Sequence, residues 1–496
     1  MRKRFEQQLS LGILPISEVE VDMKTRHQLP PLLKALQHIF TTPSLSSQVF
    51  TLLEEHVLKG KKKTGRLGMS LWEILVLGLV RKNLNIDHDF LLDHANNHET
   101  LRGILGVGRS DFVKGVKYKY QTVVDNVSLL DEDIIRKINT LVVEASHGLI
   151  KKKEEAEVLA LNIKVDSYVV ESNIHFPTDL NLLWDSGRKC LDIIGRLRGR
   201  GVMLSGWAKH NDHRLKFHRV YRKASEIHRL KGGDYQTRLK TATRDYVERS
   251  LMLSIKVKQG LTDGLNACKE GVLSVRDVLL LKDLLYFSQM LDKHIDLVDR
   301  RILQGEKIPH SEKVFSIFEP HVEWLSKGKP NRKVELGHNV SIATDQYHFI
   351  IDFEIMVKMA DPQAGRQLGE RIATLYSSIC NLASISLDRG YYSSLLKKFL
   401  SKDFGQVIMP KRGKKTAAQE VEESEEGYKK LRRAHSAVES NINQLEHNGL
   451  DKCRDKGLRG FKRYVALGIL SYNLHRMGKL LAELEVTQNR CRGRAA

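Results

Sequence analysis

Three acidic residues stand at positions where a carboxylate could do chemistry on a charged substrate. Asp166 and Asp388 each end a run in which apolar and polar residues alternate, and Glu439 lies beside the apolar stripe of a later segment. Alternation with a period of two is typical of strands, so the pattern predicts two strands that end in Asp and a helix that carries Glu. Hard divalent cations prefer oxygen ligands, and phosphodiester chemistry commonly uses two such cations about 3.5–4 Å apart. Ordinary surface acids of an α/β protein would show the same pattern.

Positive charge is the second feature that bears on chemistry. The 496 residues include 81 Lys and Arg against 60 Asp and Glu, a formal net charge of +21. About half of this excess, a net +11, lies between Arg188 and Lys240. Such an excess favours a polyanionic partner, nucleic acid above all, because neutralised phosphates supply most of the non-specific affinity. An acidic protein or an anionic membrane surface is the alternative partner.

The basic segment supplies most of the candidates for DNA contacts. We predict that phosphates are bound by Arg196, Arg198, Arg200, Lys209, Arg214, Lys216 and Arg219, and by Lys411 and Arg412 of a second basic cluster. Trp207, Phe217 and Tyr221 are interleaved with these residues. They either stack on bases or belong to the cores of helices.

Composition excludes several classes of protein. A hydrophobic share of 41% is enough for substantial packed cores and too high for a disordered basic tail. The apolar run from Leu71 to Val80 contains Glu73 and is far shorter than the about 20 residues of a membrane span. The basic N-terminus is not followed by the apolar segment of a signal peptide, and the five cysteines have no paired spacing. We therefore expect a cytoplasmic protein that is not in a membrane.

The elements that must position the acids follow from periodicity. Residues from about 32 to 150 have helical spacing, and 86–106 within them is compatible with a helix-turn-helix-like module. Alternation predicts strands at 159–165, 334–344, 349–356, 383–388 and 404–409, of which the second and third form a hairpin. Helices are predicted at 364–382, 394–400, 431–445 and 461–481, and an acid-rich connection that is mobile or exposed at 414–427.

Longer blocks around the three acids resemble a known family. Lys164 to Asp179, Asp388 to Ser393 and His435 to Asn443 are similar to the three catalytic blocks of bacterial insertion-sequence transposases of the DDE class. Phe5 to Leu9 and Leu29 to Leu32 resemble the N-terminus of the ISNCY-type branch, and the block at 449–464 is long enough to be fairly specific. The resemblance spans nearly the whole chain.

This resemblance implies a fold and an activity. Asp166, Asp388 and Glu439 would be the metal-binding catalytic triad of an RNase H-like core that holds Mg²⁺ or Mn²⁺, with two ions expected. The implied reaction is cleavage at the element's ends and transfer of the freed 3′-hydroxyl to target DNA. The implied partners are double-stranded DNA, as terminal inverted repeats and target, and a second copy of the chain. The protein would then be associated with the nucleoid.

The predicted fold class is α+β and mainly helical, with a mixed-sheet core split by a large helical insertion. The predicted domains are a helical DNA-binding or dimerisation domain at 1–150, a core at 155–178 and 334–481, a basic helical insertion at 179–333 and a basic tail at 482–496.

Some residues depart from the family pattern or compete with the triad. A better-known branch of these enzymes has Tyr, Arg and Lys around the Glu, where this chain has Arg432, His435 and Glu446. His435 could contact a phosphate or orient the carboxylate, or lie on the helix surface without a role.

Competing acids are Asp179, which could cap a helix, Asp345 in the hairpin turn, and Asp352. The alternatives to a transposase are a catalytically inactive DNA-binding relative and a metal-dependent nuclease or resolvase of the same fold.

Overall fold

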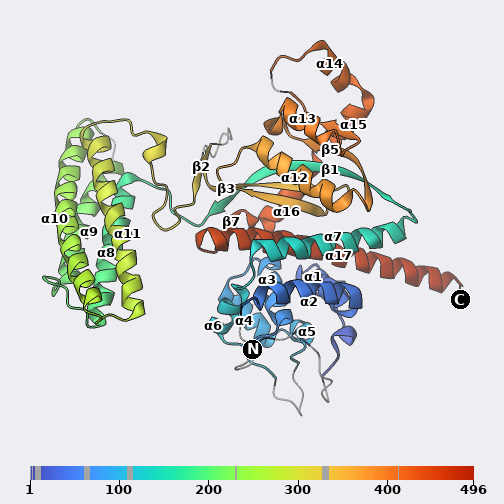
Figure 1. The fold of residues 1–496 in the computed structure, drawn as a ribbon, viewed down its shortest axis with the longest axis horizontal. Coiled ribbons are helices and arrows are strands. Elements are labelled where there is room, and N and C mark those ends of the chain that lie inside the picture. The colour runs from blue at the N-terminus through green and yellow to red at the C-terminus, as the bar shows by residue number, and fades with distance from the viewer. Residues whose placement is uncertain are drawn as a thin grey trace. The chain divides into compact units, whose positions relative to one another are not determined.

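The computed structural model describes residues 2, 4–5, 13–60, 68–108, 115–229, 232–326, 334–411 and 413–495, with side chains up to residue 489. The chain forms two compact units (Figure 1). Unit 1 comprises Met1–Asn173 and Glu323–Ala496, and unit 2 comprises Ile174–Val322. In the described part of the chain, no helix is long and apolar enough to cross a membrane.

Unit 1 contains a mixed sheet whose central strand is β1 (Leu159–Ser172). β1 pairs antiparallel with β3 (Val334–Thr344) on one side and parallel with β5 (Cys380–Leu387) on the other. β4 (Ile350–Met356) pairs antiparallel with β3, and β6 (Gln406–Ile408) pairs parallel with β5. Short strands β2 (Glu323–Ser326) and β7 (Lys452–Cys453) pair with β3 and β1. The described residues are mostly helical and contain a mixed sheet, which agrees with the predicted α+β class.

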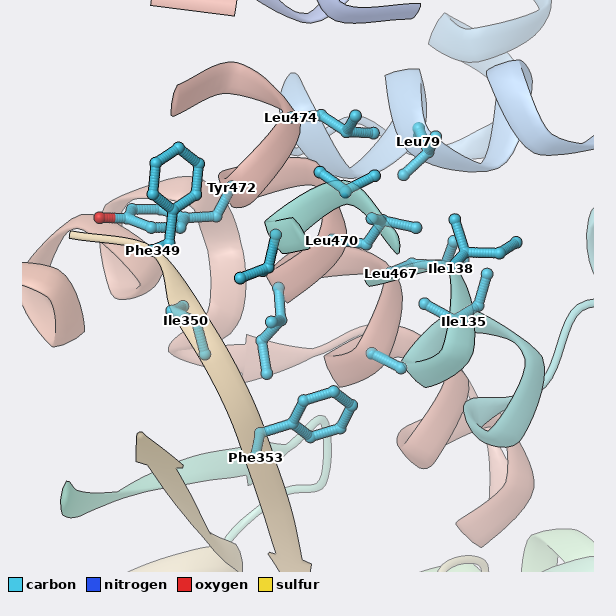
Figure 2. Packing of buried hydrophobic residues seen from close by; sticks show 14 of the residues in the cluster. Leu79, Ile135, Ile138, Phe349, Ile350, Phe353, Leu467, Leu470, Tyr472 and Leu474 are labelled. Carbon is cyan, nitrogen blue, oxygen red and sulfur yellow. The ribbon is translucent and has the colours of Figure 1, made fainter. Parts of the chain in front are cut away.

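The N-terminal part is helical and consists of η1 (Ile16–Glu18), α1 (Leu29–Thr41), α2 (Pro43–Val57), α3 (Leu71–Asn83), α4 (His88–Asn97), α5 (Glu99–Ile104), α6 (Tyr120–Val127) and α7 (Glu132–Lys153). Of these, α1, α3 and α7 pack against the long C-terminal helix α17 (Gly457–Ala495), and the others pack on these three helices. Figure 2 shows Leu79 of α3, Ile138 of α7 and Leu470 of α17 in one cluster with Ile350 and Phe353 of β4. The N-terminal helices and the sheet therefore share one hydrophobic core.

Both faces of the sheet are covered by helices, so β1 is buried on its two sides. α12 (Asp361–Tyr376) and α13 (Ser394–Leu400) lie on one face, and α7 and α17 lie on the other (Figure 1). After β6 come α14 (Ala417–Ser424), α15 (Glu426–Ala434), α16 (Ala437–Leu445) and the π-helical turn η5 (Glu446–Leu450). α16 packs against β1.

Unit 2 is a bundle with a core of its own. Its helices are α8 (Asp179–Gly199), α9 (His210–Arg229), α10 (Tyr235–Lys269) and α11 (Val275–Val298), followed by the turns η2 (Asp299–Leu303) and η3 (His310–Glu312). Trp207 and Phe217 are almost completely buried in this core. Of the two interpretations for these aromatic residues, core packing is therefore correct, because a ring enclosed by helices cannot stack on a base.

Two expectations about the segment after β6 differ from the structure. Residues 414–427 are mostly exposed, as predicted, but they are mainly helical and not an irregular connection, because Thr416 and Gln419 form a capping box that starts α14. The single helix expected at 431–445 is divided at His435, where Val438 N–H and Glu439 N–H donate to carbonyls three residues back. Ala434, placed on its apolar stripe, is exposed.

Two helix boundaries also differ from expectation. The helix expected at 364–382 ends at Tyr376, since β5 begins at Cys380 and pairs with β1. The last helix begins four residues before 461 and continues to Ala495, through the segment expected to be a tail.

Candidate active site

The sheet brings Asp166 and Asp388 to the same level. Val165 and Leu387 are register partners on the parallel strands β1 and β5, and each Asp is the next residue along its strand. Neighbouring strands lie about 4.8 Å apart, so the two carboxylates leave adjacent backbones at the level where β5 ends. Asp388 follows the end of its strand as predicted, whereas β1 continues to Ser172, so the prediction that Asp166 ends its strand was wrong. Asp166 is partly buried and accepts a hydrogen bond from Ser167 N–H (2.7 Å), whereas Asp388 is exposed and caps the turn η4 (Arg389–Tyr391).

A row of polar pairs leads along β1 and β5 to these two acids. Asn162 pairs in register with Ser384, and their side chains form a hydrogen bond of 2.8 Å. Lys164 pairs with Ser386 one step further along. Because alternate residues share a face, Asn162 and Lys164 lie on the face of Asp166. The buried Lys164 ammonium group donates to the carbonyl oxygen of Asp345 (3.5 Å).

Helix α16 brings Glu439 to the same face. His435, just before α16, shares a hydrogen bond of 3.0 Å between its Nδ1 and Ser386 Oγ on β5. Burial lowers the pKa of His435, while the carboxylates of Asp388 and Glu439 both act to raise it. Both acids are thus close enough to influence one imidazole. Glu439 itself is exposed.

The far part of α16 has a second anchor. Asn441 Oδ1 is 2.9 Å from His348 Nδ1, in the turn between β3 and β4, and accepts from Tyr472 Oη of α17 at 3.4 Å. Glu439 lies between the His435 contact and this one, so its backbone position is tied to both the sheet and α17.

The donor set fits a hard divalent cation, since all three side chains are carboxylates, two from neighbouring strands and one from the helix packed on β1. In the described residues, however, no three His, Cys, Asp or Glu side chains are already gathered closely enough to hold an ion. The carboxylates therefore need side-chain rotation, or a small movement of α16, before they can share a metal.

The competing acids are all engaged in ion pairs. Asp345 is fully buried and accepts from His147 Nε2 at 2.7 Å. Burial alone would lower the pKa of His147, but this hydrogen bond raises it to about 9. Asp352 is paired with two arginines, Arg136 at 2.8 Å and Arg371 at 2.7 Å.

Asp179 does not cap α8, because the cap is Thr178, whose hydroxyl accepts from Asn181 N–H. Asp179 is the first residue of that helix and pairs with Arg301. The competing acids are thus already neutralised by cations of their own units, in contrast to the exposed carboxylates of Asp388 and Glu439.

The residues predicted to bind DNA fall into two groups in unit 2. Arg200 is paired with Asp277, Arg214 with Asp192 and Lys216 with Asp212, and Arg198 donates to the carbonyl oxygen of Ala208. Exposed side chains without an ion pair in the described part of the chain are Arg196, Lys209 and Arg219. In unit 1, Lys411 is partly buried, and Arg412 lies outside the described residues.

Sequence reasoning missed the residues beneath the acids. Lys164 and Ser386 occupy alternate positions before Asp166 and Asp388, so the period of two already placed them on the same face as the acids. Tyr391 was missed too: its buried hydroxyl shares a hydrogen bond of 2.7 Å with Ser341 on β3 and ties the turn after Asp388 to the sheet. For Lys164 and Ser386, a polar residue between two apolar neighbours was the available signal, whereas the sequence around Tyr391 offers none.

Comparison with known proteins adds an independent finding. Residues 297–474 match the family model of the transposase DDE domain. This match supports a DDE-type transposase. The matched region contains Asp388 and Glu439 and begins after Asp166. The chain matches no curated protein and no solved structure.

Proposed function

We propose that this chain is an insertion-sequence transposase that cleaves the ends of its element and joins them to target DNA. The observation that carries the proposal is the placement of Asp166 and Asp388 at one level of adjacent parallel strands, with Glu439 on a helix over the same face. The match to the transposase DDE domain supports the same reaction class. A mixed sheet with a hairpin on one side of β1 and parallel strands on the other supports an RNase H-like core. The ISNCY-type branch stays a prediction from the sequence blocks.

In this proposal the three carboxylates hold Mg²⁺ or Mn²⁺, two ions being the expected number. Bound ions would lower the pKa of a water nucleophile and neutralise charge on the phosphate. The chain's own contribution is positioning: β1 and β5 hold two carboxylates side by side, and α16 presents the third. Burial lowers the pKa of the neighbouring His435 imidazole, which disfavours a competing positive charge beside the carboxylates.

The remaining parts of the proposal concern DNA and assembly. Phosphates of double-stranded DNA, from terminal inverted repeats or target, are bound by the basic helices of residues 179–333. Arg196, Lys209 and Arg219 are the strongest candidates because they are exposed and make no ion pair in the described chain. Residues 1–150 would recognise the repeats, and a homodimer would hold the two ends. A protein that acts on the bacterial chromosome would be found at the nucleoid.

The test is Mg²⁺-dependent cleavage and joining on duplexes that carry the DNA flanking the coding region. Asp166→Asn, Asp388→Asn and Glu439→Gln should each lower the cleavage rate about 10³-fold, since losing a metal ligand removes several kcal/mol of transition-state stabilisation. Asp403→Asn, a change of an exposed acid in unit 1, is the matched control and should cleave normally. Undiminished cleavage by any of the three variants contradicts the triad, and cleavage without a joined product indicates a nuclease instead.

A further inference from the structure

The contact between Ser386 and His435 joins the two elements that carry the exposed acids. Ser386 precedes Asp388 by two residues on β5, and His435 precedes Glu439 by one helical turn. The 3.0 Å hydrogen bond between Ser386 Oγ and His435 Nδ1 therefore spans from the strand of one acid to the helix of the other. Ser386 is buried, and burial shields the bond from exchange with water.

Local backbone structure makes this contact more important than an ordinary hydrogen bond. Continuous α-helical bonding is interrupted at His435, where Val438 N–H and Glu439 N–H bond to His435 and Ser436. The beginning of α16 is thus not held by a continuous helix on its N-terminal side. Its side-chain anchor there is His435, whereas Asn441 fixes the following turn.

A direct role for His435 on DNA phosphate agrees less well with the structure. Its Nδ1 is occupied by Ser386. The ring is also partly buried, and its neighbours Asp388 and Glu439 carry negative charge, so the site around it is unfavourable for a phosphate.

We propose that Ser386 and His435 are positioning residues that hold Glu439 within reach of Asp388, so that the three carboxylates can close on a divalent cation. The inference rests on the proposed function and adds two residues to it. Groups that orient metal ligands typically change metal affinity 10–100-fold when they are lost. The hydrogen bond should therefore affect cation affinity while leaving DNA binding unchanged.

The experiment measures Mn²⁺ binding to the full chain without DNA by titration calorimetry, alongside DNA affinity in EDTA. Ser386→Ala and His435→Ala should each weaken Mn²⁺ binding about 10–100-fold with unchanged DNA affinity. His435→Asn should retain most of the affinity, because its amide occupies the position of Nδ1, and His435→Gln should not. His447→Ala, a change of an exposed histidine in η5, is the matched control.

The outcomes separate the two proposals. Wild-type affinity in both Ser386→Ala and His435→Ala overturns the positioning role. Equal loss in His435→Ala and His435→Asn also overturns it, because the hydrogen bond would then not be the cause. If Asp388→Asn binds Mn²⁺ as tightly as the wild type, or the wild type binds none, the metal site of the proposed function fails, and the positioning role with it.

Discussion

A buried charge cluster between α3 and the start of α17 yields the sharpest prediction. Asp455 accepts from Arg81 at 2.8 Å and from Arg463 at 2.8 Å, and the side chains of Asp455 and Arg81 are only 6% and 5% exposed. Lys82, beside them, is buried over the ring of Tyr464. One carboxylate therefore balances several cations in the interior of unit 1, and Asp455→Asn removes it without changing the side-chain volume.

The magnitude follows from the pKa of Asp455. Burial by itself would raise this pKa, but Arg81 and the neighbouring cations lower it from 3.8 to about 2. This difference corresponds to about 2.5 kcal/mol of preference for the charged form. Removing one partner of a buried pair typically costs about 3–5 kcal/mol, because the other charge stays buried without compensation. We therefore expect Asp455→Asn to lower the unfolding free energy of unit 1 by about 3–5 kcal/mol at pH 7.

The pH dependence gives a second check on the same residue. A lowered native pKa contributes stability that is complete above 3.8 and disappears as the pH falls through about 2. The difference between wild type and Asp455→Asn should therefore shrink below pH 4.

Urea unfolding is monitored by hydrogen exchange in peptides from α3 and α17, so that the stability of unit 1 is measured separately from that of unit 2. The control is Glu483→Gln, which breaks a 3.1 Å pair with Lys153 whose side chains are 58% and 45% exposed, and which should cost less than about 1 kcal/mol. A loss for Asp455→Asn no larger than this control would refute the reasoning.

Three other predictions test different parts of the molecule. Gly478→Ala should destabilise unit 1 by about 3 kcal/mol or more, because the new Cβ would lie 1.8 Å from a carbonyl oxygen of α1. In Gly148→Ala the new Cβ meets no atom within 4 Å, so this change should stabilise α7 by about 1 kcal/mol. Thermal or urea unfolding measures both effects. The pKa of His147 is raised to about 9, and this shift contributes about 3 kcal/mol to the unfolding free energy. The contribution is complete below pH 6.5 and is lost as the pH rises through 9, so the urea midpoint should fall between pH 7 and 10. An unchanged midpoint would contradict the ion pair. Arg219→Gln should reduce the salt dependence of duplex binding by about one phosphate contact in fluorescence anisotropy, whereas Arg200→Gln, whose partner is already a carboxylate, should leave it unchanged.

Periodicity predicted the strands well, because each strand has a buried face on which every second residue must be apolar. β3 and α13 have the predicted bounds, and β4 and β5 differ only at their ends. β1 continues seven residues beyond its predicted end at 165, to Ser172. The division between α15 and α16 could not be predicted in this way. At this division His435 contacts Ser386, which is 49 residues away in the sequence, and periodicity carries no information about such contacts.

The sequence pattern identified the acids but not the residues that position them. Asp166 and Asp388 are conspicuous because they end polar rows, and their pairing follows from the parallel register of two strands. The anchors of α16 are single polar groups whose partners come from other elements, such as His348 from the β3–β4 turn. The excess of positive charge predicted which segment could bind DNA, but not which of its arginines already have an ion-pair partner. Arg200, for example, pairs with Asp277, which lies 77 residues away in the sequence.

The position of β1 in the chain has a consequence for biosynthesis. Asn162 on β1 forms hydrogen bonds with Gln346, 184 residues later in the sequence, and with Ser384, 222 residues later. The helices of unit 2 lie between these partners in the sequence. Contacts between residues far apart in sequence form slowly, and strands that wait for partners expose apolar surface. During translation, β1 is complete long before β3 and β5 exist, although unit 2 can already fold. The two aspartates therefore meet only once β5 has been synthesised, after about four fifths of the chain, and the third carboxylate, Glu439, follows 51 residues later. The growing chain thus carries no assembled carboxylate site until nearly all of it has been made.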